Sequence, residues 1–185
     1  MPIAFIFHGT AGHSQENWFP WLKKKLEERG FEVIVPQFPT PENQTPEAWL
    51  EVFRPYQHLW DEHTLVFGHS LGGAFLLRVL EEVEVEIRAA FLVAAPIGIL
   101  PIKNIATDKP FLEKSFDCET IRSRAQDFFI FHSDNDPFMN PENGKQLAGH
   151  LGVELNLVPG AGHFNTASGY TTFEALLEKV DGLTK

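Results

Sequence analysis

Val66-Phe67-Gly68-His69-Ser70-Leu71-Gly72-Gly73 is the stretch of this chain that decides its fold. An apolar run over residues 63–67 stops at Gly68, and a helical pattern begins at residue 74. Glycines stand two residues before and two residues after Ser70, which is the spacing of a nucleophile elbow. A side chain at a direct turn from strand to helix is exposed, and glycines on either side avoid collisions between backbones. The stretch therefore predicts a strand, a sharp turn and a helix with Ser70 at the turn. A serine that only caps a glycine-rich turn is the alternative.

The composition fits one globular domain spanning residues 1–185, because 43% of the residues are hydrophobic and 22% are charged. The formal net charge of −10 argues against nucleic acid or an anionic membrane as a partner. Cys118 is the single cysteine, so no disulfide can form within the chain and a cytoplasmic location is expected. No apolar run reaches the length of a membrane span, and the uncharged start of the chain is unlike a signal peptide.

Strand and helix patterns alternate along the chain. Apolar runs typical of buried strands occupy residues 2–7, 31–35, 63–67, 87–95, 127–132 and 153–158. Helical patterns occupy residues 17–29, 45–56, 70–83 and 140–151, and a last one follows the capping-box pattern Thr171-x-x-Glu174. Thr45-Pro46 has the form of a helix N-cap followed by proline at the first helical position. The alternation predicts an α/β fold, a three-layer α/β/α sandwich around a mostly parallel six-stranded sheet.

Polar residues follow four of the predicted strands. They are His8-Gly9-Thr10 after the first strand, Ser70 after the third, Asp134-Asn135-Asp136 after the fifth and Gly160-Ala161-Gly162-His163 after the sixth. Because the carboxyl ends of parallel strands share one edge of the sheet, we expect a nucleophile, an acid and a base at one rim. Their order along the chain is Ser, Asp, His, which is the order of the α/β-hydrolase arrangement.

With these motifs, the chain resembles an α/β-hydrolase, and within that superfamily the small YdeN-like serine hydrolases, to which retinoblastoma-binding protein nine is related. The matching residues are His8-Gly9, Asn17-Trp18, Trp21, Pro36-x-Phe38-Pro39, Trp49, residues 68–73, Ala94-Ala95-Pro96, residues 134–138 and Gly162-His163-Phe164. The resemblance implies the strand order 2-1-3-4-5-6. The acid loop departs from the common Asp-x-x-Val-Pro ending, because Met139-Asn140 stand there. The chain also has no Leu-x-Cys-x-Glu pattern, so a retinoblastoma-binding role is not carried over.

The chemistry assigns a role to each of these residues. Ser70 is the expected nucleophile, His163 the base that takes its proton, and Asp136 the acid that orients the imidazole. Asp134 is the alternative acid, and the resemblance favours Asp136. The developing oxyanion needs backbone donors, for which we expect Leu71 N–H and a second N–H from Gly9 or Thr10.

The substrate pocket is less well marked. His8, Trp18, Phe19, Phe138 and Phe164 flank the predicted loops and are candidates to line it, although each can equally be a core residue. His8 is expected to shape the oxyanion loop, whereas His69 and His132 are expected to pack or form hydrogen bonds. Residues 96–126 are too few for a separate cap domain. We therefore expect an open or thinly lidded site.

These features predict a serine hydrolase acting on small carboxylic esters through an acyl-enzyme, without cofactor or metal. His58 and His63 lack the carboxylate cluster that a metal site would need. Thioesterase, amidase and acyltransferase chemistry would use the same triad. A binding or regulatory protein that keeps the fold with a dormant triad is the alternative from another class. The oligomeric state stays open.

Overall fold

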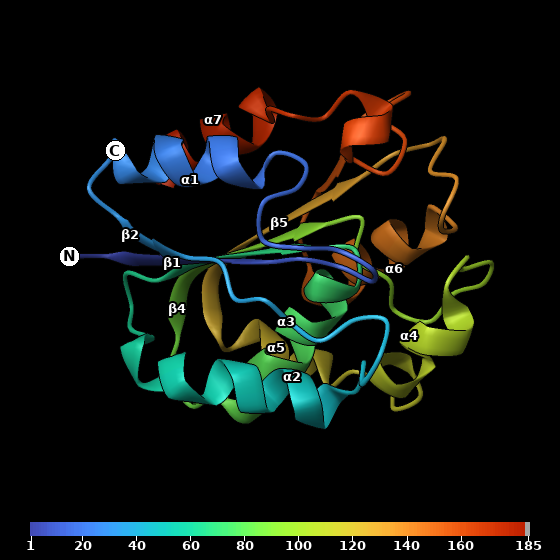
Figure 1. Ribbon diagram of the computed structural model, residues 1–185, viewed down its shortest axis with the longest axis horizontal. Coiled ribbons are helices and arrows are strands. Elements are labelled where there is room, and N and C mark those ends of the chain that lie inside the picture. Colours follow the sequence, from blue (N-terminus) through green and yellow to red (C-terminus); the bar gives the residue numbers. More distant parts are fainter. Residues whose placement is uncertain (184–185) are drawn as a thin grey trace.

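The structure, a computed structural model, describes residues 1–183. Among these residues, six parallel strands form one sheet in the order β2-β1-β3-β4-β5-β6 (Figure 1). The strands are β1 (Ile3–Phe7), β2 (Glu32–Ile34), β3 (Leu65–His69), β4 (Ile87–Val93), β5 (Ala125–His132) and β6 (Leu155–Leu157). The predicted strand order is confirmed. The order reverses between β1 and β3, and in parallel sheets ligands bind beside that point at the carboxyl ends of the strands.

Helices cover both faces of the sheet, as the three-layer prediction requires (Figure 1). One face carries α1 (Phe19–Glu27) and α7 (Glu174–Leu183). The other carries α2 (Pro46–Phe53), α3 (Leu71–Glu82), α5 (Cys118–Arg122) and α6 (Glu142–Leu151). The helix α4 (Ile105–Leu112) lies beyond the carboxyl ends of the strands. Two 3-10 helices, Arg54–Leu59 and Thr166–Ser168, complete the described elements.

Two hydrophobic cores lie on the two faces of the sheet. Phe5 and Phe7 of β1 point toward α2 and α3, while Ala4 and Ile6 point toward α1 and α7. Because successive side chains of a strand point to opposite faces, a strand buried on both sides reads as a continuous apolar run. This is why the apolar runs in the sequence located the inner strands β1, β3 and β4.

Some boundaries differ from the prediction for physical reasons. The third strand is Leu65–His69 rather than residues 63–67, because Gly68 and His69 still pair with β4. His63 lies in a turn, where its N–H donates to Asp61 Oδ1 over 3.0 Å. The predicted helix over residues 45–56 starts as expected, with Thr45 Oγ1 accepting from Ala48 N–H, but α2 ends at Phe53. Pro55 has no N–H to continue it, and a 3-10 helix follows.

The last helix also begins later than its capping pattern predicts. α7 starts at Glu174, and the first helical bond runs from Leu177 N–H to Phe173 O. Thr171 is therefore not the N-cap, and the capping-box prediction is wrong. Thr171 N–H instead donates to Gly169 O in the preceding turn.

Residues 96–126 form α4 and α5, two short helices that no sequence pattern predicted. α4 contains Pro110, and α5 is a five-residue helix whose cap, Asp117, accepts from Thr120 N–H. Asn143 of α6 anchors the start of this segment, since its Oδ1 accepts from the N–H groups of Ile97 and Ile99. The segment adds a thin cover at one end of the sheet and no separate cap domain.

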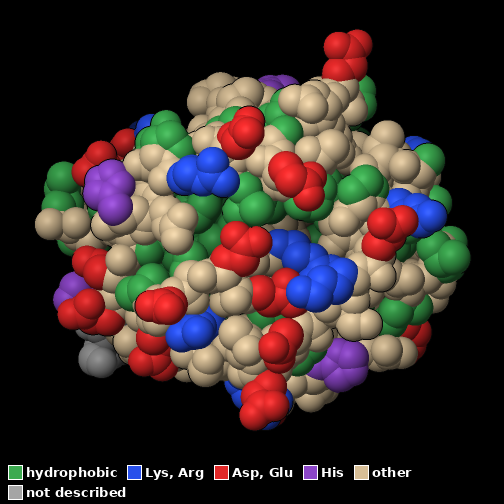
Figure 2. Space-filling model, turned by 90° about the horizontal axis from the view of Figure 1, so that it is seen from below, with side chains coloured by type: hydrophobic (Ala, Val, Ile, Leu, Met, Phe, Trp, Pro, Cys, Tyr) green, Lys and Arg blue, Asp and Glu red, His purple; other side chains and the backbone are tan. Residues whose placement is uncertain are grey.

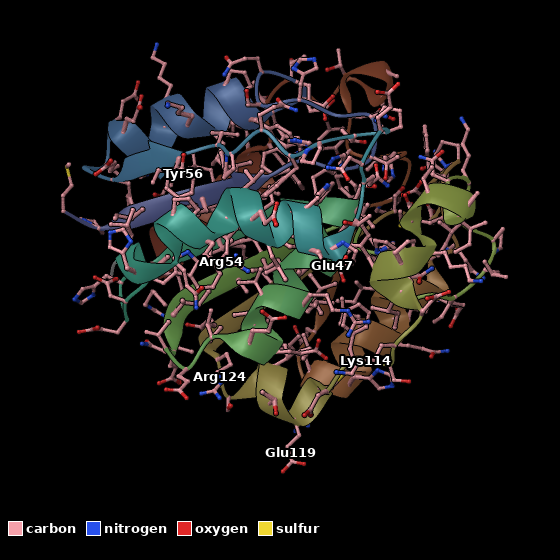
Figure 3. The ribbon with its side chains drawn as sticks, turned by 60° about the horizontal axis from the view of Figure 1, so that its bottom comes forward. Glu47, Arg54, Tyr56, Lys114, Glu119 and Arg124 are labelled. Carbon is pink, nitrogen blue, oxygen red and sulfur yellow. The ribbon has the colours of Figure 1, made fainter. Side chains whose placement is uncertain are left out.

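The face that carries α2 and α5 has acidic and basic side chains scattered among apolar ones (Figure 2). Glu47 of α2, Arg54 of the following 3-10 helix and Glu119 of α5 are all exposed there, and Glu119 points away from the molecule (Figure 3). No helix within residues 1–183 has both the length and the apolar character needed to cross a membrane.

Candidate active site

Ser70 stands at a sharp turn between β3 and α3. Its backbone has φ 54° and ψ −127°, a left-handed conformation that costs free energy for any residue but glycine. The turn is held by a hydrogen bond of 2.8 Å from Ser70 N–H to Val93 O. A Cβ on Gly68 would lie 2.6 Å from Gly73 Cα, and one on Gly72 would overlap the carbonyl groups of Phe7 and His8. The two glycines of the elbow are thus required by close backbone approach.

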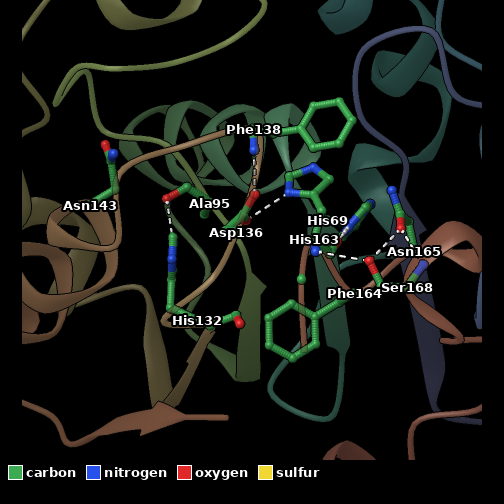
Figure 4. A network of polar contacts seen from close by, with 12 residues as sticks. His69, Ala95, His132, Asp136, Phe138, Asn143, His163, Phe164, Asn165 and Ser168 are labelled. Carbon is green, nitrogen blue, oxygen red and sulfur yellow. Dashed lines mark hydrogen bonds and ion pairs between the residues drawn. The ribbon is translucent and has the colours of Figure 1, made fainter. Parts of the chain in front are cut away.

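Asp136 and His163 are joined by a hydrogen bond (Figure 4). His163 Nδ1 and Asp136 Oδ2 are 2.8 Å apart, and the Asp136 side chain is completely buried. Asp136 Oδ1 accepts from Phe138 N–H, also over 2.8 Å. With Nδ1–H donated to the carboxylate, Nε2 of a neutral His163 is the nitrogen that can take a proton. Ser70 Oγ and Nε2 form no hydrogen bond in the described chain, and such bonds commonly tighten when substrate binds.

Phe138 covers the His163 ring on one side. The two rings are stacked with centroids 4.5 Å apart, and Lys103 Nζ lies 4.2 Å from the centroid of Phe138. The backbone supports this arrangement, because Lys103 N–H donates to Phe138 O over 2.7 Å. The segment before α4 therefore helps to hold the aromatic ring against the imidazole.

Asp134, the alternative acid, has a different partner. Its Oδ1 accepts from Gly160 N–H over 2.8 Å, and Asn135 Oδ1 accepts from Gly162 N–H at the same distance. Both side chains thus fix the loop that carries His163. The structure brings Asp136, rather than Asp134, into contact with the imidazole.

His69 connects the loop that carries His163 to the turn at Ser70. Its Nε2–H donates to His163 O over 2.8 Å, and its ring packs edge-on against Trp18 and Phe19. Burial, followed by repulsion from His163, lowers the pKa of His69 to about 3. His69 is therefore neutral at pH 7, as its hydrogen bond to a carbonyl and its apolar neighbours require.

This low pKa predicts a loss of stability in acid. A histidine in the unfolded chain binds a proton near pH 6.5 whereas folded His69 does so only near pH 3, so the unfolded state binds more protons between these values. The contribution of His69 to the free energy of unfolding is therefore fully present above pH 6.5 and is lost as the pH falls toward 3. We expect wild type to lose about 2 kcal/mol more than His69→Gln between pH 7 and pH 5 in urea unfolding. Equal losses would contradict the prediction, and exposed His63→Gln is the control.

The loop after β1 lies beside Ser70. A Cβ on Gly9 would lie 2.8 Å from Ser70 Cβ. His8 fixes this loop, since its Nδ1–H donates to Gly9 O and its Nε2 accepts from Phe38 N–H, each over 2.9 Å. Within residues 1–183, Thr10 N–H donates to no protein group. Leu71 is the first residue of α3, so its N–H has no acceptor within the helix. Gly9 N–H, the predicted alternative to Thr10, likewise has no acceptor among residues 1–183. All three N–H groups are thus free to donate to a ligand.

The predicted pocket residues lie in two different places. The side chains of His8, Trp18, Phe19 and Phe164 are fully buried and leave no surface for a ligand. They support the site from inside the protein; Trp18 Nε1–H, for example, donates to Phe164 O over 3.1 Å. Phe138 is half-buried and contacts the imidazole directly. His132, expected to pack, is buried with Nε2 3.4 Å from Ala95 O (Figure 4).

A model of the serine hydrolase family matches residues 4–181. The chain belongs to this serine hydrolase family. It is 31% identical to the hydrolase YdeN of Bacillus subtilis (strain 168) over 91% of this chain and 88% of YdeN. It is 27% identical to the serine hydrolase RBBP9 of Rattus norvegicus over 97% and 94% of the two chains. The crystal structure of the ydeN gene product from B. subtilis superimposes with a TM-score of 0.93 at 28% identity, covering 100% of this chain and 99% of that one.

The resemblance to YdeN-like α/β-hydrolases is therefore confirmed, and this serine hydrolase has the compact α/β-hydrolase fold. Asp108 is a buried polar residue beside the site of this serine hydrolase that was not predicted. Asp108 of α4 lies at the loop that carries Thr10, and its side chain contacts Thr10. No motif marks Asp108, and 98 residues separate it from Thr10, so only the folded chain brings them together.

Proposed function

We propose that this serine hydrolase cleaves small carboxylic esters through Ser70, His163 and Asp136. The observation that carries the proposal is the hydrogen bond between His163 Nδ1 and the buried Asp136 carboxylate. It selects the tautomer in which Nε2 accepts a proton, and the fixed negative charge stabilises the imidazolium that then forms. The strained conformation of Ser70 supports the same assignment, because such strain is concentrated at functional sites.

The first half of the reaction forms an acyl-enzyme. Ser70 Oγ attacks the ester carbonyl carbon while His163 Nε2 takes the hydroxyl proton. The carbonyl oxygen becomes an oxyanion, which the N–H groups of Leu71 and Thr10 would stabilise at the start of α3. The bond to the leaving oxygen then breaks, and Nε2–H returns its proton to that oxygen, so an alcohol departs.

The second half regenerates the enzyme. His163 Nε2 takes a proton from water as the water oxygen attacks the acyl carbon. When the bond to Ser70 Oγ breaks, the imidazolium gives its proton to that oxygen and a carboxylic acid is released. Asp136 keeps its negative charge throughout.

The cover of the site suggests the size of the substrate. Residues 96–126 contribute only α4, α5 and their loops, so the site has only a thin cover where larger hydrolases carry a cap domain. We therefore expect short acyl esters, free or attached to a larger carrier. The single cysteine agrees with a reducing, cytoplasmic location.

A substrate panel with a labelling reagent tests this proposal. Wild type is treated with a fluorophosphonate and assayed against p-nitrophenyl acetate, an acetyl thioester and an acetyl anilide. We expect one adduct, located on Ser70 by mass spectrometry, and fastest turnover of the ester. Faster turnover of the thioester or the anilide would overturn ester specificity and keep the serine mechanism. No adduct on folded protein would favour the non-catalytic alternative.

A further inference from the structure

A buried carboxylate lies at the loop that carries Thr10. Asp108 is 3% exposed, and its Oδ1 is 2.5 Å from Thr10 Oγ1, which donates its proton. Gln44 Nε2–H also donates to Oδ1, over 3.1 Å, whereas the Thr107 hydroxyl, 3.3 Å from Oδ1, has its shorter hydrogen bond of 3.0 Å to Asn104 O. Burial of the carboxyl group raises the pKa of Asp108. A charged group removed from water is unfavourable unless it is well hydrogen-bonded, and here Thr10 and Gln44 both donate to one carboxylate oxygen.

The same contacts connect three separate segments. Gln44, from the loop before α2, also donates to Thr10 Oγ1 over 3.1 Å, and its Oε1 accepts from Thr40 Oγ1–H over 2.5 Å. Thr40 Oγ1 in turn accepts from Ala11 N–H over 2.7 Å. Thr10 is thus held through its own side chain and through the N–H of the next residue.

These anchors act on a particular peptide group. The Thr10 side chain is held by Asp108 and Gln44, and the following peptide by Thr40, so the Thr10 backbone has little freedom to rotate. Its own N–H, in contrast, has no partner among the described residues and lies in the loop beside Ser70. A donor that is fixed before the reaction stabilises a developing charge without a cost of reorganisation.

We propose that Asp108 is a positioning residue of the active site. Through the Thr10 hydroxyl, it holds the Thr10 N–H where the oxyanion of the tetrahedral intermediate forms. This inference rests on the proposed function. The helix α4 stands where larger hydrolases have a cap. If Asp108 positions Thr10, α4 contributes to the chemical step as well as covering the site.

Steady-state kinetics on p-nitrophenyl acetate tests this inference with five variants. Two variants each remove one partner of the hydrogen bond, Asp108→Ala and Thr10→Val. Two conservative variants keep the bond: Asp108→Asn preserves the Oδ1 acceptor, and Thr10→Ser preserves the hydroxyl. The fifth variant combines Asp108→Ala with Thr10→Val. We expect Asp108→Ala and Thr10→Val each to lower kcat by roughly 10- to 100-fold with KM nearly unchanged, because the oxyanion exists only after attack. Asp108→Asn and Thr10→Ser should retain most of kcat. The combined variant should lose no more than the worse single variant, because the two residues act as one unit.

The controls separate positioning from loss of structure. Glu113→Ala, at the exposed end of α4, should match wild type. Circular dichroism checks that each variant is folded, and if Asp108→Ala does not fold, the pair Thr10→Val and Thr10→Ser carries the test. Unchanged kcat in folded Asp108→Ala or in Thr10→Val, or losses that multiply in the combined variant, would overturn the positioning role and leave the proposed function standing. A wild type that neither reacts with a fluorophosphonate nor turns over ester would overturn both.

Discussion

Ser70→Ala is expected to lower ester turnover by roughly 10⁴- to 10⁶-fold, because no other group in the proposed mechanism can form the acyl-enzyme. The fold should be unaffected. Ser70 Oγ has no hydrogen-bond partner in the described chain, and alanine meets the same backbone strain at φ 54° that serine already bears. The measurement is p-nitrophenyl acetate hydrolysis together with intact mass after fluorophosphonate treatment.

The matched control for this variant is Ser115→Ala, an exposed serine of the segment between α4 and α5. Ser115→Ala should keep full ester turnover and should still form the fluorophosphonate adduct on Ser70. Turnover or labelling that persists in Ser70→Ala would show that another nucleophile does the chemistry. Loss of activity together with loss of the circular dichroism signal would mean that the substitution had damaged the fold.

Asp136→Asn is expected to lower kcat by roughly 10⁴-fold with little change in KM. An amide can present N–H to His163 Nδ1, which would favour the tautomer that cannot accept the proton of Ser70. It also removes the negative charge that stabilises the imidazolium. The hydrogen bond of 2.8 Å between Nδ1 and Oδ2 is the contact that changes.

Asp134→Asn is the paired control, because it makes the same chemical change two residues away. Its Oδ1 can still accept from Gly160 N–H, so kcat should fall only a few-fold. If Asp134→Asn reduced kcat more than Asp136→Asn, the assignment of the two carboxylates would have to be reversed. Steady-state kinetics of both variants decides between them.

Most of the fold was predictable because the inner strands β1, β3 and β4 are buried on both faces. Each apolar run located a strand, and the close packing of β3 against α3 requires the glycines that mark the elbow. The edges of elements were less predictable, since they depend on contacts outside the local sequence. β3 continues to His69 because β4 lies beside it, and α7 begins past Thr171 because the preceding turn uses that residue's N–H.

The candidate site was predictable in its components and only partly in its geometry. The sequence places Asp134 and Asp136 in one turn, and only the path of the backbone directs one to Gly160 and the other to His163. Trp18 is aromatic and follows a predicted loop, yet the loop turns its ring into the core. Asp108 has no local signal, because its partner Thr10 lies 98 residues earlier in the chain.

The sheet ends on both sides in very short strands. β2 and β6, the two outer strands, are three residues long each, while the inner strands have five to eight. An outer strand offers its unpaired N–H and C=O groups to any passing chain, and long flat edges are templates for aggregation. Here either edge offers too few of these groups to hold a foreign strand in register. The short outer strands therefore protect the folded protein against edge-to-edge association.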